Sequence, residues 1–492
     1  MSEVHSHRYF TGSDNRIPYI DVYVIIVYMD PEIRKIAKKI GEERGIPVEV
    51  KQIGNSYYLY KDTTRWDSEK KKRTRVSEYI GKIDGHGLVE RNRRSIYEFG
   101  NSELLLSVSE DMAPELKRNF PGHWREIMAM SMVRALDPKP IRYMKSAWEK
   151  LYASTQMDAS LSENTVSEKL RAIGSDIAAQ MRFFQSLTAN GDRILFDLSS
   201  IFSKSENINL AEKGHNPKHL HLDQINFALV FSGKRHKPVI LEVLPGSVRD
   251  YKAFDHIMER YDIRECIIIA DRGLASYEMP KRKGVFLVVA IKRNFRVMDF
   301  NMNLDRSFIY NKRGILSGMK DLGGKYLYMY EDTSMRAEEE TNIIRKIEEG
   351  ERKQSDLTDE RIKLGKFAIL SNLLSDPKEI YELYKSREEV EVAFDAMKNE
   401  LENDKAYLHT TDGLRGYFFI SFISLYMYFS ILEMLKEKGL SQKISVKEAL
   451  FELSKIYVIA DGARRSLAEI PDKSQKMAEI FELKLYPKIL RS

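Results

Sequence analysis

Residues 265–274 read Glu-Cys-Ile-Ile-Ile-Ala-Asp-Arg-Gly-Leu, an unbroken apolar run that ends on an aspartate, an arginine and a glycine. A continuous Ile-rich run is typical of a strand that is covered on both faces of a sheet. Asp271 follows the run directly, at the carboxyl end of the strand, where open α/β sheets place their ligand sites. The stretch therefore predicts a central strand that carries a functional carboxylate at its end.

The segments around this strand predict a mixed α/β sheet. Three apolar, strand-like runs precede it at 193–199, 226–232 and 238–244, a helical stretch covers 250–261, and a further strand covers 285–291. Short connections among the first three runs favour antiparallel hairpins, whereas helical crossovers favour parallel strands. The order of elements thus predicts a multidomain α/β protein built on one mixed sheet with helices on both faces.

A second carboxylate, Asp197, follows the apolar residues Ile194 to Phe196 near the end of the first strand. Taken alone, Asp197 or Asp271 is better explained as an aspartate that begins a turn. Gly273 strengthens the case for Asp271, since a glycine lets the backbone turn closely around a ligand.

Residues 384–398 read Tyr-Lys-Ser-Arg-Glu-Glu-Val-Glu-Val-Ala-Phe-Asp-Ala-Met-Lys, inside a helix expected from 377 to about 401. At about 100° per residue, four side chains share an arc of roughly 60°: Tyr384, Arg387, Glu391 and Lys398. Such a stripe offers a carboxylate to a metal ion while the cations and the phenol hold phosphates. A solvated face with Glu–Arg and Glu–Lys pairs is the alternative interpretation.

Helical spacing alone does not select Glu391 among the acidic residues of this segment. Glu388 and Asp395 lie near the same stripe. A carboxylate set without His or Cys favours Mg²⁺ or Mn²⁺ over zinc. Two such ions, about 4 Å apart, can activate a water or a 3′-hydroxyl for phosphodiester displacement. Basic neighbours would then clamp the negatively charged substrate.

Together these residues resemble the Y-x2-R-x3-E-x6-K signature of the insertion-sequence-four superfamily of DDE transposases. Phe196-Asp197-Leu198-Ser199 is similar to the first aspartate motif of that family, and Ala270-Asp271-Arg272-Gly273-Leu274 is similar to the second. The resemblance covers about residues 190–440.

The resemblance implies a ribonuclease-H-like catalytic domain at 191–440, interrupted by a mainly β insertion at 292–366. It implies that Asp197, Asp271 and Glu391 are the catalytic residues and metal ligands, with Tyr384, Arg387 and Lys398 near the DNA phosphates. It also implies the partners: double-stranded DNA, as terminal repeats and as target, and a second copy of the chain in a homodimer on DNA. The reaction would be metal-dependent DNA cleavage and strand transfer.

Three further regions complete the predicted organisation. Residues 1–115 form a small N-terminal domain, with a helix at 31–44 and two strands at 57–60 and 73–80. The connection between those strands is basic, and its residues Lys71, Lys72 and Arg73 are candidates for DNA backbone contact. A solvated hairpin tip explains them equally well. Residues 116–190 read as a helical connecting or DNA-binding segment, and 441–492 as a helical tail with a role in dimerisation.

Composition places the chain among soluble globular proteins, with 43% apolar and 31% charged residues. Its net charge of +6 suits a protein that meets a polyanion, or serves solubility alone. The single cysteine, Cys266, excludes an internal disulfide, and its apolar neighbours indicate a buried structural thiol. No secretion signal is visible at the N-terminus, so a cytoplasmic location is expected, on the nucleoid when DNA is bound.

Two features have competing interpretations. The uncharged run 416–432 is 17 residues long, at the lower limit for a membrane span, and a buried core helix is the better prediction. A cluster of His215, His219 and His221 suggests a transition-metal site, although polar loop residues fit its context better.

Two other functions are consistent with the sequence. One is a metal-dependent nuclease that cuts DNA without joining it. The other is an inactive descendant of a transposase that retains only DNA binding.

Replacing Asp271 with alanine is expected to abolish DNA cleavage while leaving the fold and DNA binding intact, because the change removes one metal ligand. Cleavage of end-labelled DNA, followed on denaturing gels beside a binding assay, measures both effects. Cutting by the Asp271→Ala protein would remove this residue from the mechanism.

Overall fold

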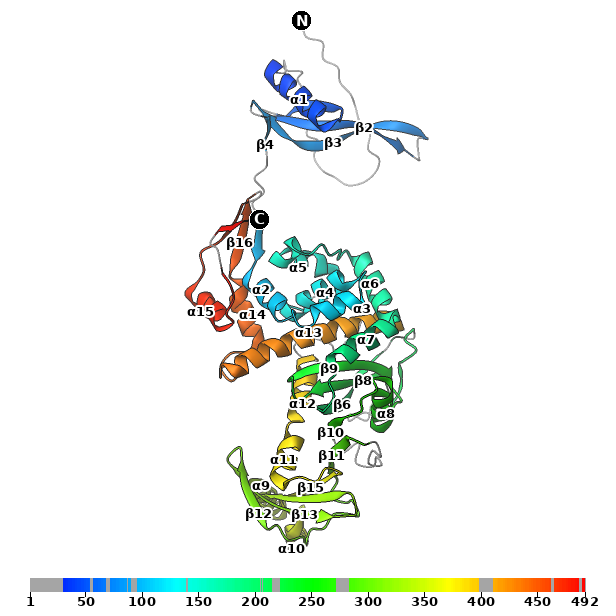
Figure 1. Ribbon diagram of the computed structural model, residues 1–492, viewed down its shortest axis with the longest axis vertical. Coiled ribbons are helices and arrows are strands. Elements are labelled where there is room, and N and C mark those ends of the chain that lie inside the picture. Colours follow the sequence, from blue (N-terminus) through cyan, green and yellow to red (C-terminus); the bar gives the residue numbers. More distant parts are fainter. Residues whose placement is uncertain are drawn as a thin grey trace. The chain divides into compact units, whose positions relative to one another are not determined.

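The structure is a computed structural model that describes residues 30–491 except 54–55, 68–70, 86, 90–94, 139, 204, 206, 215–221, 271–282, 398–409, 462–463 and 486–488. It forms two compact units, residues 1–93 and 94–492 (Figure 1).

The first unit is a four-stranded antiparallel sheet with one helix packed on it. The helix α1 (Pro31–Arg44) begins at Asp30, which accepts the Glu32 N–H, and ends at Gly45 in the left-handed conformation. The sheet has the order β1-β2-β3-β4, with β1 (Val48–Ile53), β2 (Ser56–Asp67), β3 (Lys72–Asp84) and β4 (Gly87–Val89). The predicted helix and both predicted strands are confirmed, but β2 runs further toward the hairpin tip than expected, and β3 runs further away from the tip.

The second unit is built on a ten-stranded mixed sheet. Its core strands are β6 (Asp192–Phe202), β8 (Asp223–Ser232), β9 (Lys237–Pro245), β10 (Cys266–Ala270) and β11 (Val285–Ile291). β6, β8 and β9 pair antiparallel, whereas β10 is parallel to both β6 and β11. The short strand β7 (Glu212–Lys213) pairs with β8. The predicted α/β fold with a mixed sheet is confirmed.

Helices cover both faces of this sheet. Phe196 of β6 contacts Phe254 of α8 (Asp250–Arg260), with ring centres 5.4 Å apart. Phe227 of β8 contacts Phe394 of α12 (Glu388–Asp395) at 5.6 Å. Phe227 lies opposite Ser199 of β6, so the side chains of Phe227 and Ser199 share one face. Ser199 is an odd number of residues from Phe196, and therefore Phe196 and Phe227 point to opposite faces of the sheet. α8 and α12 therefore lie on opposite faces of the sheet.

The predicted insertion extends the same sheet and contains two helices, so it is less purely β than expected. β12 (Arg306–Tyr310), β13 (Arg313–Asp321) and β14 (Tyr326–Asp332) form an antiparallel meander, which joins the sheet through β15 (Lys366–Ser371). β15 pairs antiparallel with β11. α9 (Thr333–Glu348) and α10 (Gln354–Glu360) lie between β14 and β15 in the chain.

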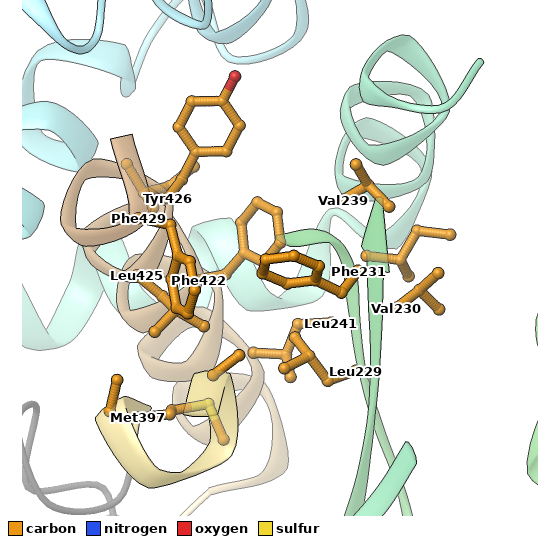
Figure 2. Packing of buried hydrophobic residues seen from close by; sticks show 14 of the residues in the cluster. Leu229, Val230, Phe231, Val239, Leu241, Met397, Phe422, Leu425, Tyr426 and Phe429 are labelled. Carbon is orange, nitrogen blue, oxygen red and sulfur yellow. The ribbon is translucent and has the colours of Figure 1, made fainter. Parts of the chain in front are cut away.

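A helical layer precedes the sheet in the chain and packs around α13 (Thr411–Glu437). Its helices are α2 (Gly100–Ser107), α3 (Ala113–Asn119), α4 (Trp124–Leu136), α5 (Met144–Glu149), α6 (Glu163–Ser175) and α7 (Ile177–Leu187). Figure 2 shows Phe422, Leu425 and Phe429 of α13 facing side chains of the β8–β9 hairpin. The Phe231 and Phe429 rings pack edge to face with centres 5.0 Å apart.

Within the described residues, α13 alone is long and apolar enough to cross a membrane, and 78% of its most apolar window is buried inside the protein. The hydroxyl groups of this helix have partners: Ser421 and Ser430 donate to the Tyr417 and Tyr426 carbonyls, and Ser424 donates to the Ser131 carbonyl of α4. The prediction of a buried core helix is confirmed.

The boundary between the units falls at Arg93, earlier than the predicted position 115. β5 (Ser95–Glu98) belongs to the second unit because it pairs with β16 (Tyr457–Asp461), near the other end of the chain. β17 (Arg464–Leu467) and β18 (Ile489–Arg491) continue that small sheet beside α14 (Val446–Ser454) and α15 (Asp472–Ile480). The tail predicted to be helical does contain α14 and α15, but it also contains β16, β17 and β18. The sequence did not indicate these strands because they are short and β16 pairs with β5, far away in sequence.

Two glycines allow α6 and α13 to pack closely. A Cβ added at Gly174 would lie 1.7 Å from the Asp412 carbonyl oxygen, and one at Gly416 would lie 1.9 Å from the Leu170 carbonyl oxygen. Gly416→Ala is therefore expected to lower the melting temperature by about 3 °C or more, because the helices must separate. Gly122→Ala is the matched control, since no heavy atom lies within 4 Å of the added Cβ. Equal melting temperatures for the two variants would contradict this account of the packing.

Candidate active site

Asp197 lies in the middle of the mixed sheet, on the face that α12 covers. It pairs with Leu229 of β8, two residues from Phe227, whose ring contacts α12. Side chains two residues apart along a strand point to the same face, so Asp197, Leu229 and Phe227 share one face. Asp197 is half-buried, and its Oδ1 accepts the Leu198 N–H at 3.0 Å.

The parallel strand β10 ends beside Asp197. Ile269 of β10 pairs with Leu195 of β6, so Ala270, where β10 ends, lies at the level of Phe196. Asp271 is the next residue in the chain, and it lies outside the described residues. Lys398 and the three histidines at 215, 219 and 221 also lie outside them.

The segment that bears Glu391 is not the single helix expected from 377 to 401. α11 (Pro377–Lys385) ends before Ser386, and α12 begins at Glu388. Across the junction the backbone bonds span three residues, as in Arg387 N–H to Tyr384 O and Val390 N–H to Arg387 O. The arc of roughly 60° that was calculated for Tyr384, Arg387, Glu391 and Lys398 assumes one uninterrupted helix, so it does not apply across this junction.

α12 itself separates Glu391 from the other two acidic candidates. Val390, Ala393 and Phe394 are buried and mark the face of the helix that packs on the sheet. At about 100° per residue, Glu391 lies about 110° from the centre of that face, Asp395 about 150° and Glu388 about 170°. Glu391 therefore lies nearer to the buried face of α12 than the other two carboxylates, and all three side chains are exposed.

The structure brings Arg387 into contact with Glu391, whereas Tyr384 packs against the core. Arg387 forms an ion pair with Glu391, and its side chain is only 16% exposed while that of Glu391 is 49% exposed. Tyr384 is half-buried and packs against the core. Lys385 pairs with Glu388 at 3.2 Å, so the Glu–Arg and Glu–Lys pairs of the alternative interpretation are both present.

One contact at this site was not predicted from the sequence. His236, in the β8–β9 turn, lies 3.0 Å from Glu389 of α12, so it links the turn to the helix that carries Glu391. His236 adopts a positive φ of 51°. No local sequence pattern indicates this contact, because His236 and Glu389 are far apart in sequence and a polar turn between two strands is common.

Among the described residues, no group of three or more His, Cys, Asp or Glu side chains could hold a metal ion. The two described members of the predicted triad, Asp197 and Glu391, supply carboxylate oxygen atoms only, a donor type that suits Mg²⁺ or Mn²⁺. Cys266 is buried in β10, and burial raises the pKa of its thiol to about 12. This agrees with the prediction of an unreactive structural thiol.

The remaining predicted DNA contacts belong to the first unit. Lys71 and Lys72 are exposed where β3 begins, and Lys71 has a positive φ of 47°. Arg73 pairs with Trp66 in the β2–β3 register.

Residues 205–427 match the family model of the transposase DDE domain. The matched range is a little under half of the chain. It includes Asp271 and Glu391 and begins after Asp197.

Comparison with other proteins adds little to this match. No curated protein is significantly similar to the chain. Among solved structures, a chain in the cryo-EM structure of the piggyBac transposase synaptic complex with hairpin DNA is similar over 74% of this chain and 82% of that one. The identity is 10% and the TM-score is 0.38.

Glu391→Gln is expected to lower Mg²⁺-dependent DNA cleavage by about two orders of magnitude, as other losses of one transition-state contact do. The change keeps the shape of the side chain and removes its charge. Asp395→Asn, the same change on the solvent side of α12, is the matched control and should retain activity. Equal rates of cleavage by the two variants would show that Glu391 is not the residue selected on this helix.

Proposed function

We propose that this protein is a DNA transposase that binds the ends of an insertion sequence, cuts them and joins them to a target. The match of residues 205–427 to the transposase DDE domain carries the proposal. It is supported by the shared sheet face of Asp197 and α12, the helix that bears Glu391. The fold proposed for residues 191–440 is ribonuclease-H-like, as the signature of the segment 384–398 implies.

Asp197, Asp271 and Glu391 are the proposed ligands of two Mg²⁺ or Mn²⁺ ions. These residues fit a hard divalent cation, because their donor atoms are carboxylate oxygens. Asp197 is half-buried on β6, and Glu391 belongs to α12, which packs on the same face of the sheet. When bound, such ions activate the attacking oxygen and stabilise the departing one in phosphodiester displacement.

Arg387 is proposed to exchange partners when the site is loaded. In the free protein its guanidinium neutralises Glu391. A metal ion would take over that role, and Arg387 would then turn to a phosphate of the DNA, for which a planar guanidinium is well suited. Tyr384 and Lys398 are proposed to hold neighbouring phosphates and so to fix the scissile bond for in-line attack.

The proposed partners are double-stranded DNA, as terminal repeats and target, and a second copy of the chain, because two element ends must be joined at one place. Lys71, Lys72 and Arg73 are proposed to contact the DNA backbone. The 441–492 region is the proposed dimer contact. The proposed location is the cytoplasm, on the nucleoid when DNA is bound.

Incubation with the terminal DNA of its own element should yield cuts at the element boundary and joined products in Mg²⁺, and neither in EDTA. Denaturing gels of end-labelled DNA resolve the two product classes. Cuts without joined products would replace the transposase by a metal-dependent nuclease. Binding without cuts in either Mg²⁺ or Mn²⁺ would indicate a descendant that retains DNA binding alone.

A further inference from the structure

The small sheet of the first unit has two chemically different faces. Ile33 and Ala37 of α1 pack with Leu59 and Ile83 and form a small core on one face. Residues next to Leu59 in the strand point the other way, and within the described part of this unit no helix covers that opposite face. Its side chains include Ile53, 60% exposed, and Tyr79, 48% exposed.

Three tyrosines gather at the centre of this open face. Tyr58 and Tyr60 come from β2, and their ring centres lie 6.2 and 5.5 Å from that of Tyr79 on β3. A β-bulge between Leu59 and Tyr60 places Tyr60 opposite Tyr79. Gly81, two residues further along β3, lies opposite buried Leu59 and so on the face covered by α1. Regular alternation would place Tyr79 on that same face, but the bulge places its ring on the open face.

Lysines border the aromatic cluster. Lys51 Nζ lies 4.6 Å from the centre of the Tyr60 ring, and Lys82 lies opposite Tyr58 in the strand register. Lys51 also pairs at 3.0 Å with Glu49, which lies opposite Tyr60, and Asp62 lies on the same face two residues from Tyr60.

The positive charge of the protein is concentrated in this unit. Between residues 30 and 93 the sequence contains 16 Lys and Arg against 11 Asp and Glu, a net charge of +5, while the whole chain carries +6. A unit with an excess of positive charge and exposed aromatic rings suits a polyanion whose bases are free to stack.

We propose that this open face binds single-stranded DNA, with unpaired bases stacked on Tyr58, Tyr60 and Tyr79 and the strand backbone along Lys51 and Lys82. Stacking needs only the flat face of a base, so the site tolerates many sequences. Duplex DNA does not satisfy it, because bases in a duplex are already stacked on each other. The proposal concerns binding alone and does not depend on the cleavage chemistry proposed above.

The test is the affinity of the full-length protein for a fluorescein-labelled mixed-sequence 20-nucleotide strand, measured by anisotropy in EDTA so that no cleavage occurs. Tyr79→Ala should weaken binding by about tenfold, the effect of losing one stacked base. Tyr79→Phe keeps the ring and should stay within about twofold of the unchanged protein. Tyr79→Leu keeps apolar bulk without a flat ring and should behave like Tyr79→Ala, which separates stacking from packing.

Two further comparisons complete the design. Tyr326→Ala removes a half-buried tyrosine at the start of β14 in the other unit, and it should leave affinity unchanged. Lys82→Ala should reduce the slope of log affinity against log salt by about 0.7, the value for one phosphate of a single strand.

Three results would overturn the proposal. They are equal affinity of Tyr79→Ala and the unchanged protein for the single strand, an equal loss of affinity for the matching duplex, and tighter binding of RNA of the same sequence. Because the assay contains no metal ion, an inactive enzyme can still pass it, and a cleaving enzyme can still fail it.

Discussion

α13 packs its apolar side chains against the β8–β9 hairpin on one side and against α4 and α6 on the other, and the second unit is arranged around that packing. Phe227 stacks on Phe418 with ring centres 5.4 Å apart, and Phe231 packs on Phe429. Burying large aromatic residues of this kind contributes about 1.5–3 kcal/mol each. One helix thus joins the helical layer to the sheet that carries the candidate site.

The candidate site follows from the same packing. α12 precedes α13 in the chain and lies on the same face of the sheet, since Phe227 contacts Phe394 of one and Phe418 of the other. The contact between Phe227 and Phe394 places α12, the helix that carries Glu391, on the face of the sheet on which Asp197 lies. On the other side of the short turn at Ser386 and Arg387, α11 packs on the same sheet against β10, β11 and β15, and its Tyr381 contacts Phe308 and Tyr310 of the insertion.

The two units differ in how their surfaces are used. In the second, helices cover both faces of the sheet at its centre, and the central strands β8, β10 and β11 are mostly apolar and buried. In the first, one face is covered by α1 and the other presents tyrosines and lysines. Alternation along a half-covered strand leaves one set of side chains free for a partner, and this is the physical basis of the proposed stacking surface.

The sequence by itself determined the elements whose signals are local. The apolar run 266–270, the strand 285–291 and the helix 31–44 are set by side chains within one segment, and all three form where the pattern predicts them. The motif spacing also identified Asp197, Asp271 and Glu391 as candidates.

Tertiary structure alone decided the relations between distant segments. The addition of β12–β15 to the main sheet, the pairing of β5 with β16 and the His236–Glu389 contact all depend on partners far away in sequence. A strand pattern records which face is apolar, but the choice of partner depends on complementary surfaces elsewhere in the fold.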